Sequence, residues 1–261
     1  MHLTEPVVSD DPARLPQPDL VLLGVKLPDT AAAIAALRPV MRPGTAILSL
    51  QNGVTKDDVL RVIFGTEAVM GGVTYVSTRI LRPGVIGQTG PLQRLVLGEY
   101  DGTRTDRVAA LLDATARAGV AVEHAPDIRV AIWQKFTFLV GHSGTTAAMR
   151  LPIGPIRENP RTRAFLRDVI AEVVAVARAA GVALPDDAVE GALRRADTVP
   201  PGMTSTMHED LEAGRRLELP WLSGTVVDLG HLHGVPTPYN RAIRDILAAY
   251  ADGPPRPPSK A

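Results

Sequence analysis

Apolar and polar positions divide the chain into two halves with different periodicities. In the first half short apolar runs alternate with helical stretches, and two of them, Asp19–Val25 and Thr45–Leu50, are typical of strands buried in a parallel sheet. The same pattern predicts further strands at Ala68–Val76, Leu92–Gly98 and Ala121–His124, and helices at Pro28–Leu37, Lys56–Phe64 and Arg104–Ala118. Such alternation indicates an α/β sheet.

From about Asp127 the strand pattern stops and long amphipathic helical segments follow. The predicted helices are Ile128–Met149, Arg161–Ala180, Asp186–Ala196, Ser205–Gly214, Pro220–His233 and Tyr239–Tyr250. We therefore predict an α/β protein with a Rossmann-like domain over residues 1–124 and an all-helical domain over residues 125–261. The length allows each domain to bury its own core.

Composition narrows the range of partners. Lysine plus arginine and aspartate plus glutamate number 28 each, so no net field favours nucleic acid or an anionic membrane, and we expect neither as a partner. The absence of cysteine excludes disulfides and thiolate chemistry, and the histidines lack metal-ligand spacing, so we expect no metal site. No apolar run is long enough to span a bilayer, and residues 1–11 lack the pattern of a signal peptide, which favours the cytoplasm.

Polar residues follow the first two predicted strands at their carboxyl ends. Lys26 closes the first strand and Asn52-Gly53 follows the second. Ligands bind at this edge of open α/β sheets, where an amide can form hydrogen bonds and a glycine lets backbone approach closely. The alternatives are a surface lysine that simply ends a strand and an ordinary Asn-Gly turn.

Lys135 lies in an unusually apolar helical stretch. Burial would lower the pKa of its ammonium group toward the range useful for proton transfer. Helical spacing places Leu139 and Ser143 on the same face as Lys135. The alternative is a lysine whose stem lies along apolar surface while its ammonium group reaches water.

Glu218 precedes Leu219-Pro220, where a helix can begin, so its carboxylate is expected at a helix N-terminus that favours the charged form. A capping acid with no further task is the alternative. Ser205 and Thr206 open the preceding helix, and their hydroxyl groups are candidates for caps or for ligand contacts.

Five segments together resemble the ketopantoate reductase (2-dehydropantoate 2-reductase) family in order and spacing. They are Asp19–Lys26, Gln51–Val54, Ile132–Phe136, Thr206–Glu218 and Gly234–Asn240. The resemblance implies NADPH-dependent reduction of a 2-keto acid, with ketopantoate to pantoate in pantothenate biosynthesis as the first expectation. It also implies a homodimer and a helical half with the C-terminal fold of 6-phosphogluconate dehydrogenase.

The resemblance assigns roles to individual residues. Lys135 matches the catalytic lysine, and Glu218 matches the acid that holds substrate and orients that lysine. Lys26 and Asn52 match residues near the nicotinamide and the substrate, and Thr206 replaces a substrate-contacting serine. Ser143 is the remaining candidate for substrate binding, and Glu218 is also a candidate for cofactor binding.

Two departures from the family leave alternatives open. Leu139 and Ser143 stand where asparagines are expected, so the hydrogen bonds to substrate must differ. The chain has no GxGxxG motif before its first predicted strand, and we expect the family's opening βαβ unit to be missing. The alternatives are a non-catalytic or binding remnant of the family and a related hydroxyacid dehydrogenase.

Overall fold

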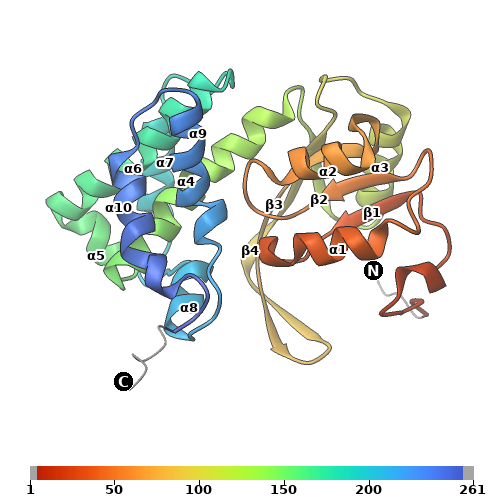
Figure 1. The fold of residues 1–261 in the computed structure, drawn as a ribbon, viewed down its shortest axis with the longest axis horizontal. Helices are drawn as coiled ribbons and strands as arrows, with labels where there is room; N and C mark the ends of the chain where they lie inside the picture. The colour runs from red at the N-terminus through yellow and green to blue at the C-terminus, as the bar shows by residue number, and fades with distance from the viewer. Residues whose placement is uncertain (1–4, 255–261) are drawn as a thin grey trace, which may run out of the picture. The chain divides into compact units, whose positions relative to one another are not determined.

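The computed structural model describes residues 5–254, apart from the side chains at 79, 89, 91 and 92, and it contains two compact units (Figure 1). The chain passes from the first unit to the second between Ile132 and Trp133, inside helix α4 (Ile128–Met149). The predicted domain boundary after residue 124 lies just ahead of this helix. Each unit is described separately below.

The first unit is built on a five-stranded sheet. Its strands, in both chain and sheet order, are β1 (Leu20–Leu23), β2 (Ala46–Ser49), β3 (Val69–Arg82), β4 (Val85–Gly98) and β5 (Ala121–His124). β3 and β4 run antiparallel, whereas the other neighbouring strands are parallel. Every predicted strand is present, which confirms the α/β class.

Helices cover both faces of this sheet. They are α1 (Thr30–Leu37), α2 (Lys56–Phe64) and α3 (Asp106–Arg117), with 3₁₀ turns at Pro12–Arg14, Leu27–Asp29 and Thr66–Ala68. Ile47 of β2 packs with α1 and α2, whereas its neighbours Ala46 and Leu48 pack in a second cluster with Val108 of α3. Since successive side chains of a strand point to opposite faces, α1 and α2 lie on one face and α3 on the other.

The two parallel strands differ in burial. All four residues of β2 are buried, as predicted, but in β1 Leu23 is buried while Leu22 is 56% exposed. β1 is therefore only partly buried, whereas its apolar run favoured a fully buried strand. Among the described strands it lies at the edge of the sheet, and an apolar run does not by itself indicate how many neighbours a strand has.

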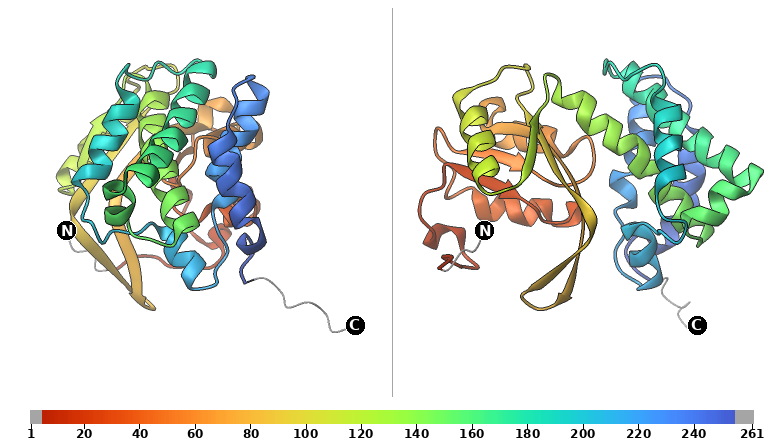
Figure 2. Two further views of the ribbon diagram at one scale, coloured as in Figure 1. Left: turned by 90° about the vertical axis from the view of Figure 1, so that its left-hand side faces the viewer. Right: turned by 180° about the vertical axis from the view of Figure 1, so that it is seen from behind.

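The sequence patterns missed the outer half of the β3–β4 hairpin, which extends well beyond the sheet (Figures 1 and 2). The strands were predicted to end at Val76 and begin again at Leu92, but they continue to a two-residue turn at Pro83-Gly84. In this arm Ile80 is 75% and Ile86 69% exposed. Since the adjacent residues Ile80 and Leu81 are both largely exposed, apolar positions in this arm do not alternate as they do in a strand with one buried face.

The second unit is all helical, as predicted (Figure 2). After α4 come α5 (Ile153–Glu158), α6 (Pro160–Ala179), α7 (Ala188–Thr198), α8 (Thr206–Glu212), α9 (Ser223–Leu232) and α10 (Pro238–Leu247), with 3₁₀ turns at Leu219–Trp221 and Ala248–Tyr250. The short helix α5 was not predicted. Within residues 5–254, no helix combines the length and apolar character needed to cross a membrane.

Helix α4 is enclosed on all sides in its second half, where residues 140–147 are all buried. A Cβ on Gly141 would lie 2.5 Å from Ile170 of α6, and a Cβ on Gly144 would lie 2.8 Å from Ile243 of α10. These glycines let the neighbouring helices approach closely. The prediction of an amphipathic helix was therefore wrong for this segment, because a helix without an exposed face needs no polar stripe.

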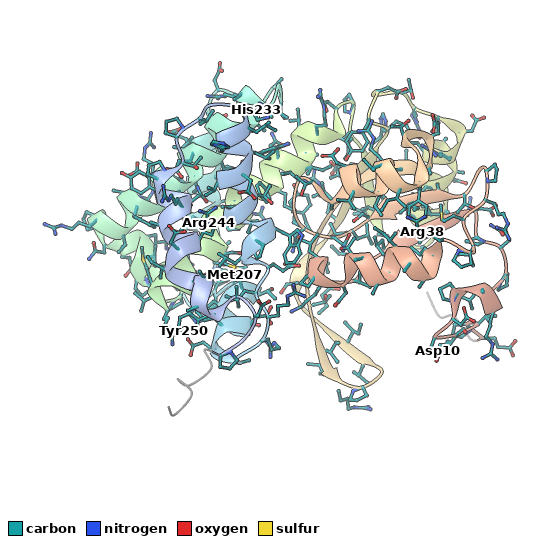
Figure 3. The ribbon with its side chains drawn as sticks, viewed as in Figure 1. Asp10, Arg38, Met207, His233, Arg244 and Tyr250 are labelled. Atoms are coloured by element: carbon teal, nitrogen blue, oxygen red, sulfur yellow. The ribbon has the colours of Figure 1, made fainter. Side chains whose placement is uncertain are left out.

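A buried carboxylate of α6 stabilises the start of α10. Glu172 accepts hydrogen bonds at 2.8 Å from the backbone N–H groups of Tyr239 and Asn240, and another at 2.8 Å from the Asn240 side chain. These backbone groups belong to the first turn of α10, where no carbonyl of the helix can accept from them. Arg244, labelled in Figure 3, then pairs with Asp228 of α9 at 3.7 Å.

Candidate active site

In the first unit, Lys26 and Asn52 follow adjacent parallel strands at the same edge of the sheet. Leu23 of β1 is in register with Ser49 of β2, and both chains leave the sheet there. Lys26 is exposed and precedes the 3₁₀ turn Leu27–Asp29, while Asn52 is partly exposed. Gly53 has φ +93°, a conformation that favours glycine. The sequence had placed both residues at this edge.

The residue before Asn52 connects the two strand-end loops, which the sequence patterns did not reveal. Gln51 is 7% exposed. Its side-chain nitrogen donates to the Val25 carbonyl at 3.0 Å and to the Thr30 hydroxyl at 2.8 Å, and its side-chain oxygen accepts from the Ser49 hydroxyl at 3.0 Å. Val25 lies in the loop after β1, Thr30 begins α1 and Ser49 ends β2, so the Gln51 side chain connects the segments that follow the two strands.

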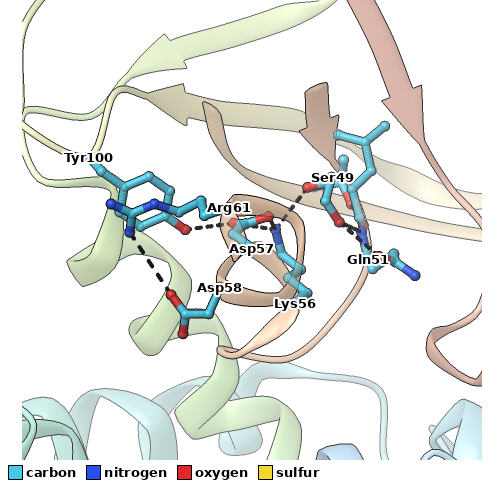
Figure 4. Close-up of polar contacts among 9 residues, drawn as sticks. Ser49, Gln51, Lys56, Asp57, Asp58, Arg61 and Tyr100 are labelled. Carbon is cyan, nitrogen blue, oxygen red and sulfur yellow. Dashed lines mark hydrogen bonds and ion pairs between the residues drawn. The ribbon is translucent and has the colours of Figure 1, made fainter. Parts of the chain in front are cut away.

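A buried ion pair holds the same segment from its other side (Figure 4). Lys56 is 4% and Asp57 1% exposed. The Lys56 ammonium group donates to the Ser49 carbonyl at 2.9 Å and to both oxygens of Asp57, and the Tyr100 hydroxyl donates to Asp57 at 2.6 Å. The guanidinium group of Arg61 stacks over the Tyr100 ring.

Burial governs the protonation of this cluster. Burial lowers the pKa of Lys56, and the neighbouring charge of Asp57 opposes that shift. Burial, followed by the Asp57 charge, raises the pKa of the Tyr100 hydroxyl. The sequence Lys56-Asp57-Asp58 did not indicate a buried ion pair, because charged residues at the start of a helix are usually exposed.

In the second unit, Lys135 lies near the start of the enclosed part of α4. Lys135 and Leu139 are partly buried and Ser143 is 2% exposed. Their spacing of four residues places all three on one face of the helix, as predicted. Trp133 and Phe136 flank the lysine in the buried core and contact each other edge to face at 5.6 Å between ring centroids.

Glu218 is partly buried and lies between the buried residues Leu217 and Leu219. It occupies the N-cap position of the 3₁₀ turn Leu219–Trp221, as the sequence suggested, but its side chain makes no capping hydrogen bond there. A capping role alone therefore does not account for this carboxylate.

The two hydroxyl residues at the start of α8 have different environments. Buried Ser205 caps the helix by accepting from the His208 N–H at 3.0 Å, and its hydroxyl also contacts that of Thr146 at 2.9 Å. Thr206 is exposed at the first position of the helix. Of the two candidates, Ser205 is thus the cap, and the Thr206 hydroxyl remains accessible.

Among the described histidines, His142 is buried, whereas His231 and His233 are exposed. His142 stacks on Phe138 at 5.4 Å between ring centroids, and burial lowers its pKa. Although the Thr204 backbone lies near this ring, neither ring nitrogen forms a hydrogen bond of good geometry. In the described part of the chain, no group of three or more histidine or acidic side chains is arranged to hold a metal ion.

Comparison with known proteins gives a consistent result over both units. The family model described as ketopantoate reductase PanE/ApbA matches residues 1–102, and the model of the C-terminal part of the same family matches residues 127–251. A 2-dehydropantoate 2-reductase of Halobacterium salinarum is 31% identical over 253 residues, which cover 97% of this chain and 82% of that protein.

Solved structures agree with this result. The PanE/ApbA family ketopantoate reductase of Ralstonia eutropha JMP134 has a TM-score of 0.85 at 35% identity, covering 93% of this chain and 79% of that one. The 2-dehydropantoate 2-reductase of Geobacter metallireducens GS-15 has a TM-score of 0.82 at 30% identity, covering 88% and 76%. The chain therefore belongs to the ketopantoate reductase family.

Proposed function

We propose that this protein reduces a 2-keto acid to a 2-hydroxy acid with a nicotinamide cofactor, and that ketopantoate is the substrate to test first. One observation carries the proposal: a chain of this family holds a lysine, Lys135, partly buried in α4 between the buried side chains of Trp133 and Phe136. A general acid for a ketone needs a protonated group in such an environment.

In this proposal Lys135 donates a proton to the ketone oxygen, where negative charge develops as the carbonyl is reduced. A cation placed beside that oxygen also stabilises the developing charge. Glu218, a carboxylate without a capping hydrogen bond, holds the substrate and orients the lysine. The Thr206 hydroxyl, which is exposed, and Ser143, which is buried within α4 at 2% exposure, are further candidates for substrate contacts.

The cofactor-binding residues proposed in the first unit are Lys26 and Asn52. The accessible ammonium group and amide at the carboxyl edge of the sheet fit the polar nicotinamide end of such a cofactor. A bound reduced nicotinamide supplies the hydride for the reduction. NADPH in preference to NADH, a homodimeric assembly and a cytoplasmic location stay predictions.

Leu139 favours a second candidate, a related hydroxyacid dehydrogenase whose keto acid has an apolar substituent. This side chain is one helical turn from Lys135 on the same face and cannot form hydrogen bonds. Substrates with an apolar group would lose no hydrogen bond beside it, whereas a hydroxylated group would remain unpaired.

The decisive experiment is titration of the purified chain with NADPH and with NADH, followed by addition of ketopantoate or of 2-keto acids with alkyl and phenyl substituents. Oxidation of the nicotinamide with ketopantoate supports the first candidate, and a preference for the apolar keto acids supports the second. Absence of both cofactor binding and turnover would contradict the enzymatic proposal and favour a non-catalytic member of the family.

Replacement of Glu218 by alanine is expected to raise the KM for the keto acid about tenfold or more, because a charged group that orients substrate is lost. Steady-state kinetics with the keto acid varied at saturating cofactor would measure this change. The matched control is Glu212→Ala, which removes an exposed acid on α8 that pairs with Arg150 at 3.5 Å. An unchanged KM in Glu218→Ala would limit Glu218 to a structural role.

A further inference from the structure

Gln51 joins the two loops that carry Lys26 and Asn52. Its side-chain nitrogen donates to Val25 and Thr30, which follow β1, and its side-chain oxygen accepts from Ser49 at the end of β2. Val25 and Thr30 precede Gln51 by 26 and 21 residues in the sequence. Because the side chain is 7% exposed, water competes little for these contacts.

The orientation of this amide is determined by its partners. The Val25 carbonyl can only accept, and the Thr30 hydroxyl already donates to the Leu27 carbonyl at 2.7 Å, so both require a donor from Gln51. The Ser49 hydroxyl donates to the other end of the amide. Glutamate at this position would lack the donors, and asparagine would be too short to reach both loops.

Residues 24 and 25 of the loop after β1 have little packing of their own, although Leu27 at its end is buried. Val25 is 37% exposed, and a Cβ on Gly24 would have no neighbour within 4 Å. The hydrogen bonds from Gln51 therefore contribute more to the position of this segment than they would in a well-packed loop. The loop after β2 is held independently, since Lys56 donates to the Ser49 carbonyl at 2.9 Å.

We propose that Gln51 is a positioning residue for the reaction: it sets the spacing between Lys26 and Asn52 without touching cofactor or substrate. This inference rests on the proposed function, because it requires both loops to contact the same cofactor. Lys56 fixes the end of β2. The hydrogen bonds of Gln51 then hold the less well packed residues before Lys26 in place relative to that end.

The first test compares Gln51→Leu and Gln51→Glu with a control variant, Gln17→Leu. Gln17 makes a similar link before the strands, donating to the Val40 carbonyl at 2.8 Å and to the Thr45 hydroxyl at 3.2 Å. The Thr45 hydroxyl in turn donates to the Pro18 carbonyl at 2.9 Å. Gln51→Leu should cost more stability than Gln17→Leu, because Gln17 is exposed whereas Gln51 is 7% exposed and also accepts a hydrogen bond from Ser49.

Kinetics should separate these variants. Gln51→Leu and Gln51→Glu are expected to lower kcat/KM about tenfold or more, mainly through a higher KM for the cofactor, since small displacements of binding groups have large kinetic effects. Gln17→Leu should keep kcat/KM within about twofold of the wild type. Equal kcat/KM in Gln51→Leu and the wild type would overturn the proposal, as would equal losses in the Gln51 and Gln17 variants.

A double-mutant cycle tests whether Gln51 acts through Lys26. If it does, adding Gln51→Leu to Lys26→Ala should reduce kcat/KM by no more than about twofold further, because the positioned group is already gone. Fully multiplicative losses would overturn the proposal.

Hydrogen exchange gives a readout that does not depend on turnover. Amides of residues 24–26 should exchange faster in Gln51→Leu than in the wild type and Gln17→Leu. Unchanged exchange there would overturn the positioning role even in an inactive protein. A wild-type chain without turnover would contradict the proposed function alone, so the two failures are distinguishable.

Discussion

Lys135→Ala should lower kcat for keto acid reduction by about 10²- to 10⁴-fold, the range typical of losing a positioned general acid. The lysine is partly buried near the start of α4, beside the buried rings of Trp133 and Phe136. Alanine has a high helix propensity and Lys135 is only partly buried, so the fold should persist. Steady-state kinetics together with thermal unfolding would measure both effects.

Two further variants define the role of Lys135. Gln134→Ala changes the exposed neighbour in the same helical turn and should leave kcat unaltered. Lys135→Arg keeps the positive charge but replaces the ammonium group with one that does not release its proton in proteins, so it too should be strongly impaired. An arginine variant with normal kcat would remove the general-acid role and leave only charge stabilisation.

Asp57→Ala should destabilise the protein by about 3–5 kcal/mol, the usual consequence of leaving one member of a buried ion pair without its partner. Lys56 would then be a buried ammonium group with the Ser49 carbonyl as its remaining acceptor in this cluster, and the Tyr100 hydroxyl would lose the carboxylate to which it donates. Chemical denaturation at neutral pH would measure the free energy of unfolding.

The size of this loss should depend on pH. Burial already lowers the pKa of Lys56 below the value of 10.5 expected in the unfolded chain, and Asp57 opposes that shift. In Asp57→Ala the folded pKa falls further, so the unfolded state binds the proton over a wider range and stability rises with pH within it. The difference from the wild type should therefore shrink as pH rises toward 10.5.

Neighbouring substitutions provide the controls for Asp57. Asp58→Ala removes an acid of the same charge from the same helical turn, but its side chain is 67% exposed and 3.9 Å from Arg61, so the change should be below about 1 kcal/mol. The double variant Lys56→Met, Asp57→Asn removes both charges and should recover most of the loss. A loss of the same size in the double variant would contradict the ion-pair explanation.

The helical half was predicted nearly completely because its signals are local. A period of 3.6 residues identifies a helix without knowledge of its neighbours, as for α6 and α10. The bounds of α4 (Ile128–Met149) were predicted correctly as well, but its predicted amphipathic character was wrong, because the surroundings of a helix decide that pattern. Gly141 and Gly144 admit α6 and α10 so closely that α4 has no exposed face between residues 140 and 147, and no polar stripe marks it.

The candidate site residues also divide into those that local sequence patterns indicate and those that depend on distant segments. The positions of Lys26 and Asn52 follow from strand ends, and the common face of Lys135, Leu139 and Ser143 follows from helical spacing, so sequence alone could identify them. Gln51 could not be identified, because its side-chain partners Val25 and Thr30 lie more than 20 residues away, and an ordinary Gln-Asn-Gly turn would show the same letters.

By itself the sequence determined the order and type of most elements, the family resemblance and the residues at the strand ends and on α4. Tertiary structure alone decided which polar groups are buried and what they contact: Lys56 and Asp57 in the first unit, and Glu172 at the start of α10 in the second. The reason is physical. Periodicity arises from backbone geometry within one element, whereas burial and hydrogen-bond partners arise from segments that meet only after folding.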